Sequence, residues 1–317
     1  RPVPRGAPAW PLCRSVVNSA LDRTAAAVDL GPMFPIRDHN PSNRTPIVTW
    51  ALIAINVIVF LSYYPSLSGS ERQLMAFFDA WALIPAEVLS GADGHTLVTS
   101  MFLHGGWMHL IGNMLFLYIF GDNLEDLLGH LGYLVFYLAA GLAAAAGQII
   151  AGPGSTIPMV GASGAIAGVM GGYLLFFPRA RIDVLVIIVV LIKIFTVPAW
   201  VMLGLWFGLQ LFNGLAMDVA GGGVAYWAHA GGFVAGVVLL VPRWLRLGGV
   251  DFWGRWHGKP PHAEVTYVTE PRRISPIPRV RRVTPTAPAS APSRDPTRIP
   301  RSGARNRLRS PWSGGPD

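Results

Sequence analysis

Six apolar segments recur along the central part of the chain, and each is separated from the next by glycine, proline or charged residues. The segments cover residues 47–63, 105–121, 131–151, 159–177, 197–215 and 224–241. A hydrocarbon core about 30 Å thick needs roughly 20 residues of apolar helix to cross it, so each segment is predicted to span a bilayer. The pattern therefore predicts an all-α fold, a polytopic membrane protein built as a six-transmembrane-helix bundle.

Two further apolar regions are too short or too interrupted to cross a bilayer. Residues 182–195 form an apolar run that contains Asp183 and Lys193, so we interpret this run as interfacial or as a tilted lead-in to the fifth span. The loop of residues 65–103 contains short apolar stretches between acidic residues. These stretches predict short helices that lie in the membrane interface.

Composition agrees with a membrane protein and excludes an ordinary water-soluble domain. Hydrophobic residues make up 52% of the chain and charged residues only 13%, with a net charge of +8. Between residues 45 and 242 the only Lys and Arg are Arg72, Arg179, Arg181 and Lys193. We therefore attribute the basic balance to the retention of Lys and Arg in the cytoplasm, and we expect no binding of nucleic acid.

The charge distribution also predicts an orientation and a division of the chain. Both termini are predicted to be cytoplasmic, and the acidic first loop is predicted to lie on the opposite side. We expect a disordered cytoplasmic arm over residues 1–45, with Met33 as the true start, a membrane domain over residues 46–243 and a disordered basic tail over residues 244–317. The tail fits a solvated segment better than an electrostatic contact with anionic lipid.

The second, fourth and sixth spans then enter the membrane from the outer side, and each carries polar residues within its first turns. These residues are His109 and Asn113, Ser163, and His229. Because they share one depth and one side of the bilayer, we expect them to meet in a single site. This expectation follows from the order of the spans and not from any local motif.

Ser163 and His229 are candidates for nucleophilic catalysis. A histidine inside a membrane span is costly and usually functional, whereas the alternative for the Gly-x-Ser-Gly pattern is packing of small residues. Gly232 and Gly236 could pack against Gly164, Gly168 and Gly171 and bring the imidazole to the Ser163 hydroxyl. No Asp or Glu lies in any span, so the prediction is a Ser–His dyad in which His229 acts as general base and then as general acid.

Acyl transfer also needs hydrogen-bond donors for the developing oxyanion. His109 and Asn113 are four residues apart and so share one helix face; we predict that they supply these donors, together with the backbone N–H groups of Ser163 and Gly161. No H-E-x-x-H motif is present, and no carboxylate lies near these histidines to complete a metal site. No cofactor or metal is therefore expected. His104 lies on another face and is predicted to order the first loop.

The combination resembles the rhomboid family of intramembrane serine proteases, in its six-helix bacterial form. Three pieces carry the likeness in the family's order: His104-Gly-Gly-Trp-Met-His-Leu-Ile-Gly-Asn113, Gly161-Ala-Ser-Gly-Ala165 and Ala228-His-Ala-Gly-Gly232. The resemblance implies a serine-type endopeptidase of the bacterial inner membrane that cleaves transmembrane or membrane-adjacent segments of other proteins. It also implies a flexible cap formed by the loop before the sixth span and a lateral gate formed by the fifth helix.

Two positions depart from the family pattern. His95-Thr96 occupies the place of a Trp-Arg pair in the first loop, and Ala167 stands where many members have an aromatic ring that stacks on the histidine. The orientation of His229 must then depend on another group, for which Tyr226 and Trp227 are candidates. A non-catalytic rhomboid-like protein and a small-molecule transporter are the competing classes; the sequence leaves substrate identity and oligomeric state open.

Overall fold

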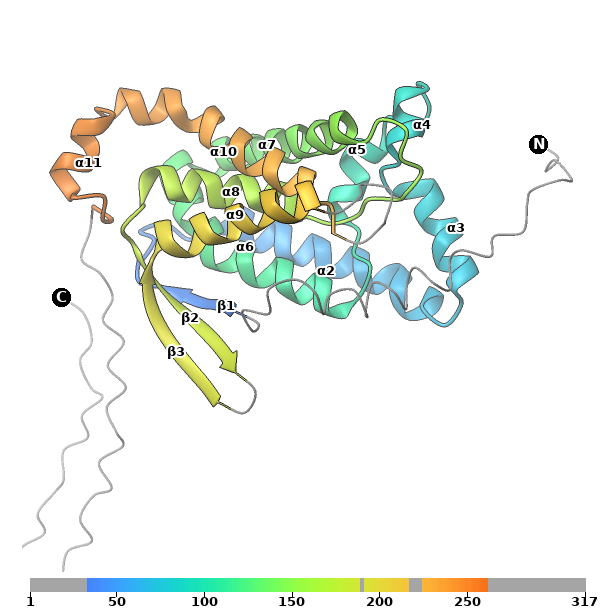
Figure 1. Ribbon diagram of the computed structural model, residues 1–317, viewed down its shortest axis with the longest axis horizontal. Helices are drawn as coiled ribbons and strands as arrows, with labels where there is room; N and C mark the ends of the chain where they lie inside the picture. The colour runs from blue at the N-terminus through green and yellow to red at the C-terminus, as the bar shows by residue number, and fades with distance from the viewer. Residues whose placement is uncertain (1–32, 189–190, 217–223, 262–317) are drawn as a thin grey trace, which may run out of the picture. The chain divides into compact units, whose positions relative to one another are not determined.

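The computed structural model describes residues 33–188, 191–216 and 224–261, and its main body is a bundle of long helices (Figure 1). A helix occupies each of the six predicted spans, which confirms the mostly helical fold class. These helices are α2 (Ile47–Leu67), α6 (Trp107–Leu128), α7 (His130–Ala151), α8 (Ser163–Phe176), α9 (Ala199–Ala216) and α10 (Tyr226–Arg246).

Four of the helices, α2, α7, α9 and α10, are long and apolar enough to cross a membrane. Helix α6 has the length but carries Asp122, Glu125 and Asp126 near its end. Helix α8 has only 14 residues, so it spans about 21 Å, which is less than a hydrocarbon core of about 30 Å. The prediction that the fourth helix begins near Met159 was wrong, because the helix begins at Ser163.

Helix α8 lies at the centre of the bundle, and most of its side chains are buried. Its glycines permit close contact with α10: a Cβ atom added at Gly232 would collide with the Gly164 carbonyl oxygen, and one added at Gly236 with that of Gly168. A Cβ atom at Gly171 would likewise collide with the Phe233 carbonyl oxygen. The predicted packing of these small residues is confirmed.

Beside the helices lies a small antiparallel sheet that the sequence did not predict. It has the order β1-β2-β3, formed by β1 (Met33–Asp38), β2 (Arg181–Ile188) and β3 (Leu191–Pro198). The hairpin of β2 and β3 projects from the bundle in Figure 1. Residues 182–195 are thus a β-hairpin and not a tilted lead-in, because their Val- and Ile-rich sequence favours extended backbone. Residues 33–38, expected to belong to a disordered arm, form the edge strand β1, which pairs with β2.

Asp183 joins β1 to the hairpin. Its Oδ2 atom accepts a hydrogen bond from Arg37 Nε at 2.6 Å. Its Oδ1 atom accepts one from Thr196 Oγ1 at 2.6 Å and lies 3.0 Å from His39 Nε2. Burial of Asp183 opposes ionisation, but the hydrogen bonds from Thr196, His39 and Arg37 outweigh it and lower its pKa to about 2. The charge in this apolar stretch is therefore a structural anchor.

Glu125 holds the start of α2. Its carboxylate accepts hydrogen bonds from the backbone N–H groups of Val48 and Thr49, each at 2.8 Å, and lies 2.6 Å from His130 Nδ1. A carboxylate at a helix N-terminus satisfies unpaired N–H groups and the positive end of the helix dipole. Helix α6 thus continues past the predicted end of the second span at residue 121 and includes the acidic residues Asp122, Glu125 and Asp126.

Residues after the last span also have structure. Helix α10 continues to Arg246, and α11 (Val250–Trp256) follows it. Trp253 Nε1 donates to the Leu175 carbonyl at 2.9 Å, and the ring of Phe252 packs edge-on to that of Phe176. The boundary of the predicted disordered tail at residue 244 was therefore wrong. The rest of that tail, the segment before Met33 and the predicted cap loop lie largely outside the described residues.

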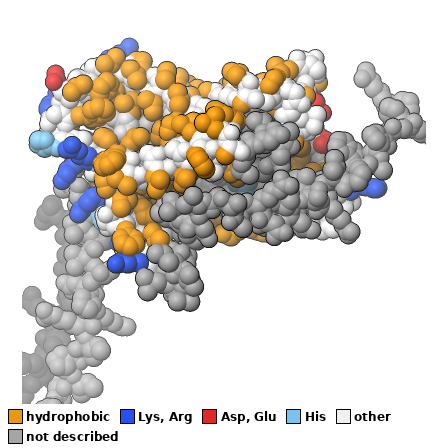
Figure 2. Space-filling view, viewed as in Figure 1, with side chains coloured by type: hydrophobic (Ala, Val, Ile, Leu, Met, Phe, Trp, Pro, Cys, Tyr) orange, Lys and Arg blue, Asp and Glu red, His pale blue; other side chains and the backbone are white. Residues whose placement is uncertain are grey.

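The first loop contains short helices, as predicted: α3 (Glu71–Trp81), α4 (Pro85–Leu89), α5 (Thr96–Thr99) and the 3-10 helix η2 (Ser100–Phe102). On the face seen in Figure 2, hydrophobic side chains cover the flank of the bundle. Lys and Arg side chains gather near the end that carries α11. An apolar flank with charged ends is the surface expected of a helical membrane protein.

Candidate active site

Ser163 is the first residue of α8, and the first loop holds the segment that leads to it. The backbone groups of Leu83 and Met159 exchange hydrogen bonds of 3.0 and 2.8 Å, and Gly161 N–H donates to the Ser100 carbonyl at 2.9 Å. Gly161 has φ of +130°, a conformation that favours glycine. This turn brings the chain sharply into the helix and leaves the Ser163 side chain at the helix start.

His229 lies in the first turn of α10, and its Nε2 atom is 2.8 Å from Ser163 Oγ. The two residues are 66 positions apart, and they meet because Gly164 and Gly232 remove the side chains that would hold α8 and α10 apart. Both side chains are partly buried. The structure thus brings together the predicted serine and histidine at hydrogen-bond distance.

The other ring nitrogen of His229 contacts α9. Its Nδ1 atom lies 2.8 Å from Oε1 of Gln210, and its ring centroid is 5.7 Å from that of Trp206. Tyr226 and Trp227, the candidates from the sequence, line the neighbouring cavity instead. Sequence reasoning missed Gln210, although a strongly polar amide inside an apolar span was the signal that could have found it.

His109 lies across the site on α6. The backbone N–H of Gly105 donates to its Nδ1 atom at 3.4 Å, which leaves the ring proton on Nε2. A Cβ atom added at Gly161 would lie 2.8 Å from His109 Nε2 and 3.5 Å from Ser163 Oγ. The imidazole N–H and the serine hydroxyl therefore border the same small space, which the missing side chain of Gly161 keeps open.

Asn113 is one turn further along α6 and is buried, with 8% of its surface exposed. Its Nδ2 atom has no hydrogen-bond partner among the described residues, and the residue lines the same cavity as Ser163. A buried donor without a partner is uncommon, because leaving it unpaired costs about 1–3 kcal/mol. The Asn113 amide is thus free to bind an incoming acceptor.

The prediction that the Gly161 N–H serves as an oxyanion donor was wrong. This group already donates to the Ser100 carbonyl, so it cannot also point at a substrate in this arrangement. Gly161 instead keeps open the space between His109 and Ser163, because it has no side chain. His104 is fully buried outside the cavity, and its backbone N–H and carbonyl both bond to the Tyr63 hydroxyl, at 2.7 and 2.6 Å. These contacts fit the predicted role in ordering the first loop.

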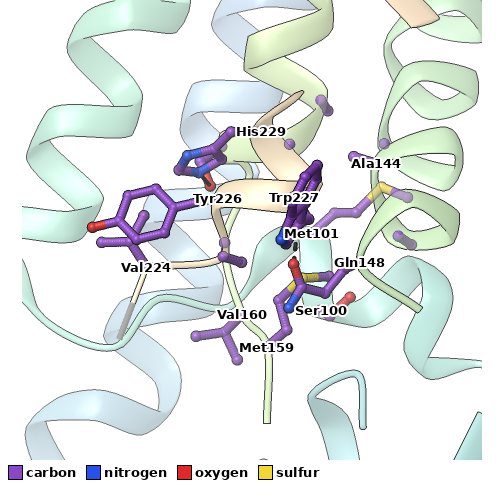
Figure 3. A pocket seen from close by; sticks show the side chains of 18 of the residues that line it. Ser100, Met101, Ala144, Gln148, Met159, Val160, Val224, Tyr226, Trp227 and His229 are labelled. Carbon is purple, nitrogen blue, oxygen red and sulfur yellow. Dashed lines mark hydrogen bonds between the residues drawn. The ribbon is translucent and has the colours of Figure 1, made fainter. Parts of the chain in front are cut away.

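The site opens into a cavity of about 610 Å³ (Figure 3). Its lining includes Ser163, His229, His109, Asn113 and Gly161, together with apolar side chains such as those of Met101 and Val160. In Figure 3 the rings of His229, Tyr226 and Trp227 project from the start of α10, and of these three rings that of Trp227 lies nearest to Gln148. A mainly apolar cavity with a few convergent polar groups is typical of a binding or catalytic site.

Fold and site define a class: polytopic α-helical membrane proteins with a Ser–His pair in an internal cavity. Comparison with known proteins narrows this class, because residues 92–246 match the family model described as the Rhomboid domain. The chain belongs to the rhomboid family.

Three relatives show how far the similarity extends. Rhomboid protein 1, mitochondrial, of Saccharomyces cerevisiae is 28% identical over 65% of this chain and 55% of its own length. Rhomboid-like protein 11, chloroplastic, of Arabidopsis thaliana is 30% identical over 44% of this chain and 47% of its own. Rhomboid protease GluP of Bacillus subtilis is 26% identical over 63% of this chain and 36% of its own. The chain thus spans about half or less of the length of these relatives.

Proposed function

We propose that this protein is an intramembrane serine endopeptidase that cleaves transmembrane or membrane-adjacent segments of other membrane proteins. The observation that carries the proposal is the 2.8 Å contact between His229 Nε2 and Ser163 Oγ, made beside a cavity inside a bundle of membrane-spanning helices. Similarity to a relative named as a rhomboid protease supports the same reaction.

In the first step Ser163 Oγ attacks the carbonyl carbon of the scissile peptide bond. A new C–O bond forms, the carbonyl electron pair moves to the oxygen, and the serine proton passes to His229 Nε2. A serine hydroxyl is a weak nucleophile unless a base removes its proton during attack. The hydrogen bond between the two side chains supplies this base without any movement of the helices.

The negative charge then develops on the former carbonyl oxygen. His109 Nε2–H and the Asn113 amide are the side-chain donors proposed to bind it, because both border the cavity at Ser163 and the Asn113 Nδ2 atom is unpaired among the described residues. Donors fixed in place before the reaction lower the barrier, and loss of one typically costs about 2.7–4 kcal/mol.

Collapse of this intermediate breaks the C–N bond, and His229 gives its proton to the leaving amine. Water then attacks the acyl-enzyme, His229 takes a proton from this water, and the proton returns to Ser163 as the C–O bond breaks. Water can reach the cavity because α8 is short and Ser163 lies at its start. The cycle needs no group beyond these side chains and water.

The substrate in this proposal is a segment of polypeptide that is extended at the cut. A helical peptide bond is shielded by its own side chains and hydrogen bonds, so the helix must unwind before its carbonyl reaches Ser163. We therefore expect small or helix-weakening residues near the cleaved bond. We also propose that both termini face the cytoplasm; the bacterial inner membrane stays a prediction.

The direct test is labelling of the purified full-length protein with a fluorophosphonate, which forms a covalent bond with an activated serine. We expect the wild-type protein to be labelled at Ser163, and labelling to be lost in the Ser163→Ala and His229→Ala variants. Ser90→Ala, a change at an exposed serine after α4, is the matched control and should label like the wild type. Equal labelling of the wild-type and Ser163→Ala proteins contradicts the proposal.

A further inference from the structure

We infer that Gln210 is a positioning residue that holds His229 in the tautomer required for proton transfer from Ser163. The inference rests on the proposed function, because it assigns a role within the same reaction. Its basis is a chain of contacts across three helices. Ser163 of α8 meets one nitrogen of His229 on α10 at 2.8 Å, and Gln210 of α9 meets the other nitrogen at 2.8 Å.

A neutral imidazole carries one proton, on either Nδ1 or Nε2. The side-chain oxygen of Gln210 only accepts hydrogen bonds, so its contact requires the proton of His229 to be on Nδ1. Nε2 then presents a lone pair to the Ser163 hydroxyl, which is the arrangement that a general base needs. The opposite tautomer would donate from Nε2 to Ser163 and could not take its proton.

The same contact stabilises the positive charge that appears on His229 during attack. The imidazolium still carries Nδ1–H, and a hydrogen bond in which one partner is charged is stronger than one between neutral groups. Gln210 is 9% exposed, so water does not easily replace this acceptor. The amide oxygen of Gln210 thereby takes the place that a carboxylate occupies in a catalytic triad. Unlike that carboxylate, the amide is neutral, so no ionised acid has to be buried beside His229.

Trp206 adds a second restraint from the same helix. It precedes Gln210 by four residues, so both side chains lie on one face of α9. The Trp206 ring is tilted 35° to that of His229 at 5.7 Å and also packs 6.1 Å from Phe233. Ala167 offers no ring from α8 and is fully buried. The position of α9 therefore determines both the ring plane and the tautomer of the catalytic base.

The test measures the rate of fluorophosphonate labelling of the full-length protein in detergent at pH values from 4 to 9. Wild-type labelling should slow at low pH as His229 takes up a proton. In Gln210→Glu a carboxylate would favour the imidazolium, so the acid limb should move to higher pH by about 1–3 units. In Gln210→Leu the acceptor is lost, so the limb should move to lower pH and the plateau rate should fall about 10- to 100-fold.

Phe212→Leu is the matched control, because this residue lies on α9 but is 61% exposed. It should leave both the plateau rate and the acid limb unchanged. A purely structural role for Gln210 could lower the rate of its variants but would not move the limb in opposite directions. If the acid limb of the labelling rate lies at the wild-type pH in both Gln210 variants, the inference is overturned.

A second measurement does not depend on activity. In ¹⁵N NMR spectra of histidine-labelled protein above the acid limb, with His229→Ala for assignment, we expect the Nδ1–H tautomer at His229 in the wild type and its loss in Gln210→Leu. An Nε2–H tautomer in the wild type overturns the role of Gln210 even if Ser163 is labelled. The expected tautomer without labelling of Ser163 overturns the proposed function alone.

Discussion

Two buried asparagines on α6 have different roles: one stabilises the fold, and the other is proposed to act in the reaction. Asn123 Nδ2 donates to the Asn40 carbonyl at 2.6 Å, which ties the segment after β1 to the helix. Asn113 Nδ2 has no partner among the described residues and faces the cavity at Ser163. Burial of an unpaired amide opposes folding, so the presence of Asn113 is better explained by the reaction than by stability.

This contrast gives a prediction for the two positions. Asn113→Ala should slow labelling or cleavage about 10²- to 10³-fold, the effect of losing one oxyanion donor, while the melting temperature stays equal or rises. Asn123→Ala should lower the melting temperature, because it removes a buried hydrogen bond that typically contributes about 0.5–1.5 kcal/mol, and should keep the wild-type rate per folded molecule.

The measurements are thermal unfolding in detergent and the rate of labelling at Ser163. If Asn113→Ala lowers the melting temperature by as much as Asn123→Ala and leaves the rate unchanged, the donor role assigned to Asn113 is wrong.

Among the secondary-structure elements, α8 and α10 determine the geometry of the site. Small residues at a helix interface allow backbones to approach closely where lipid gives no hydrophobic force for association. Gly168 and Gly236 make this approach about one turn further along than Gly164 and Gly232. The separation of the two helices sets the distance from Ser163 to His229, so this glycine contact supports catalysis as well as stability.

We expect Gly236→Ala to destabilise the protein by about 1–3 kcal/mol, the usual cost of overpacking, because the new Cβ atom would collide with the Gly168 carbonyl oxygen. The change should also slow labelling by separating Ser163 from His229. Gly208→Ala on α9 is the control, since its Cβ atom would have no neighbour within 4 Å. It should be neutral or slightly stabilising, because alanine favours a helix.

Thermal unfolding and the labelling rate, measured on both variants in one detergent, decide this prediction. Equal melting temperatures for Gly236→Ala and Gly208→Ala would show that the α8 and α10 backbones are not in the close contact described.

At the scale of the whole molecule, charge lies at opposite ends of an apolar bundle. Arg179 and Arg181 follow α8, and Arg243 and Arg246 lie in the last turn of α10, next to α11. The charged residues of the loop 68–106 at the other end are acidic, except Arg72. Retention of Lys and Arg in the cytoplasm therefore predicts that α11 lies inside and that the Ser163 cavity opens toward the outer side.

Single cysteines test this orientation. In a Cys13→Ser background, we expect a Ser90→Cys variant to react with a membrane-impermeant maleimide in intact bacterial cells with a permeabilised outer membrane. An Asp251→Cys variant should react only after lysis. Both replaced residues are exposed, at opposite ends of the chain's helical bundle. The reverse labelling pattern would invert the topology and place the site on the cytoplasmic side.

Much of this architecture could be predicted from the sequence, and the gaps have identifiable causes. The helix positions follow from local apolar runs, and the shared depth of Ser163 and His229 follows from the order of the spans. The pairing of residues 33–38 with 182–186 was missed because it joins segments that are remote in the chain. The local hairpin of β2 and β3 was missed because its apolar residues were interpreted as a segment associated with the membrane. The Gly161 N–H was misassigned because its partner, the Ser100 carbonyl, belongs to a different loop.

The membrane class, the helical fold and the four polar side chains that could share one site can be inferred from the order of residues along the chain, because these features depend on local composition and on the number of spans. Which atoms lie within hydrogen-bond distance depends on how the helices pack. The acceptor for His229 Nδ1 comes from α9 and the unpaired donor from α6. Hydrogen bonds depend on distances of a few tenths of an ångström between packed helices, and no pattern along one chain specifies these distances.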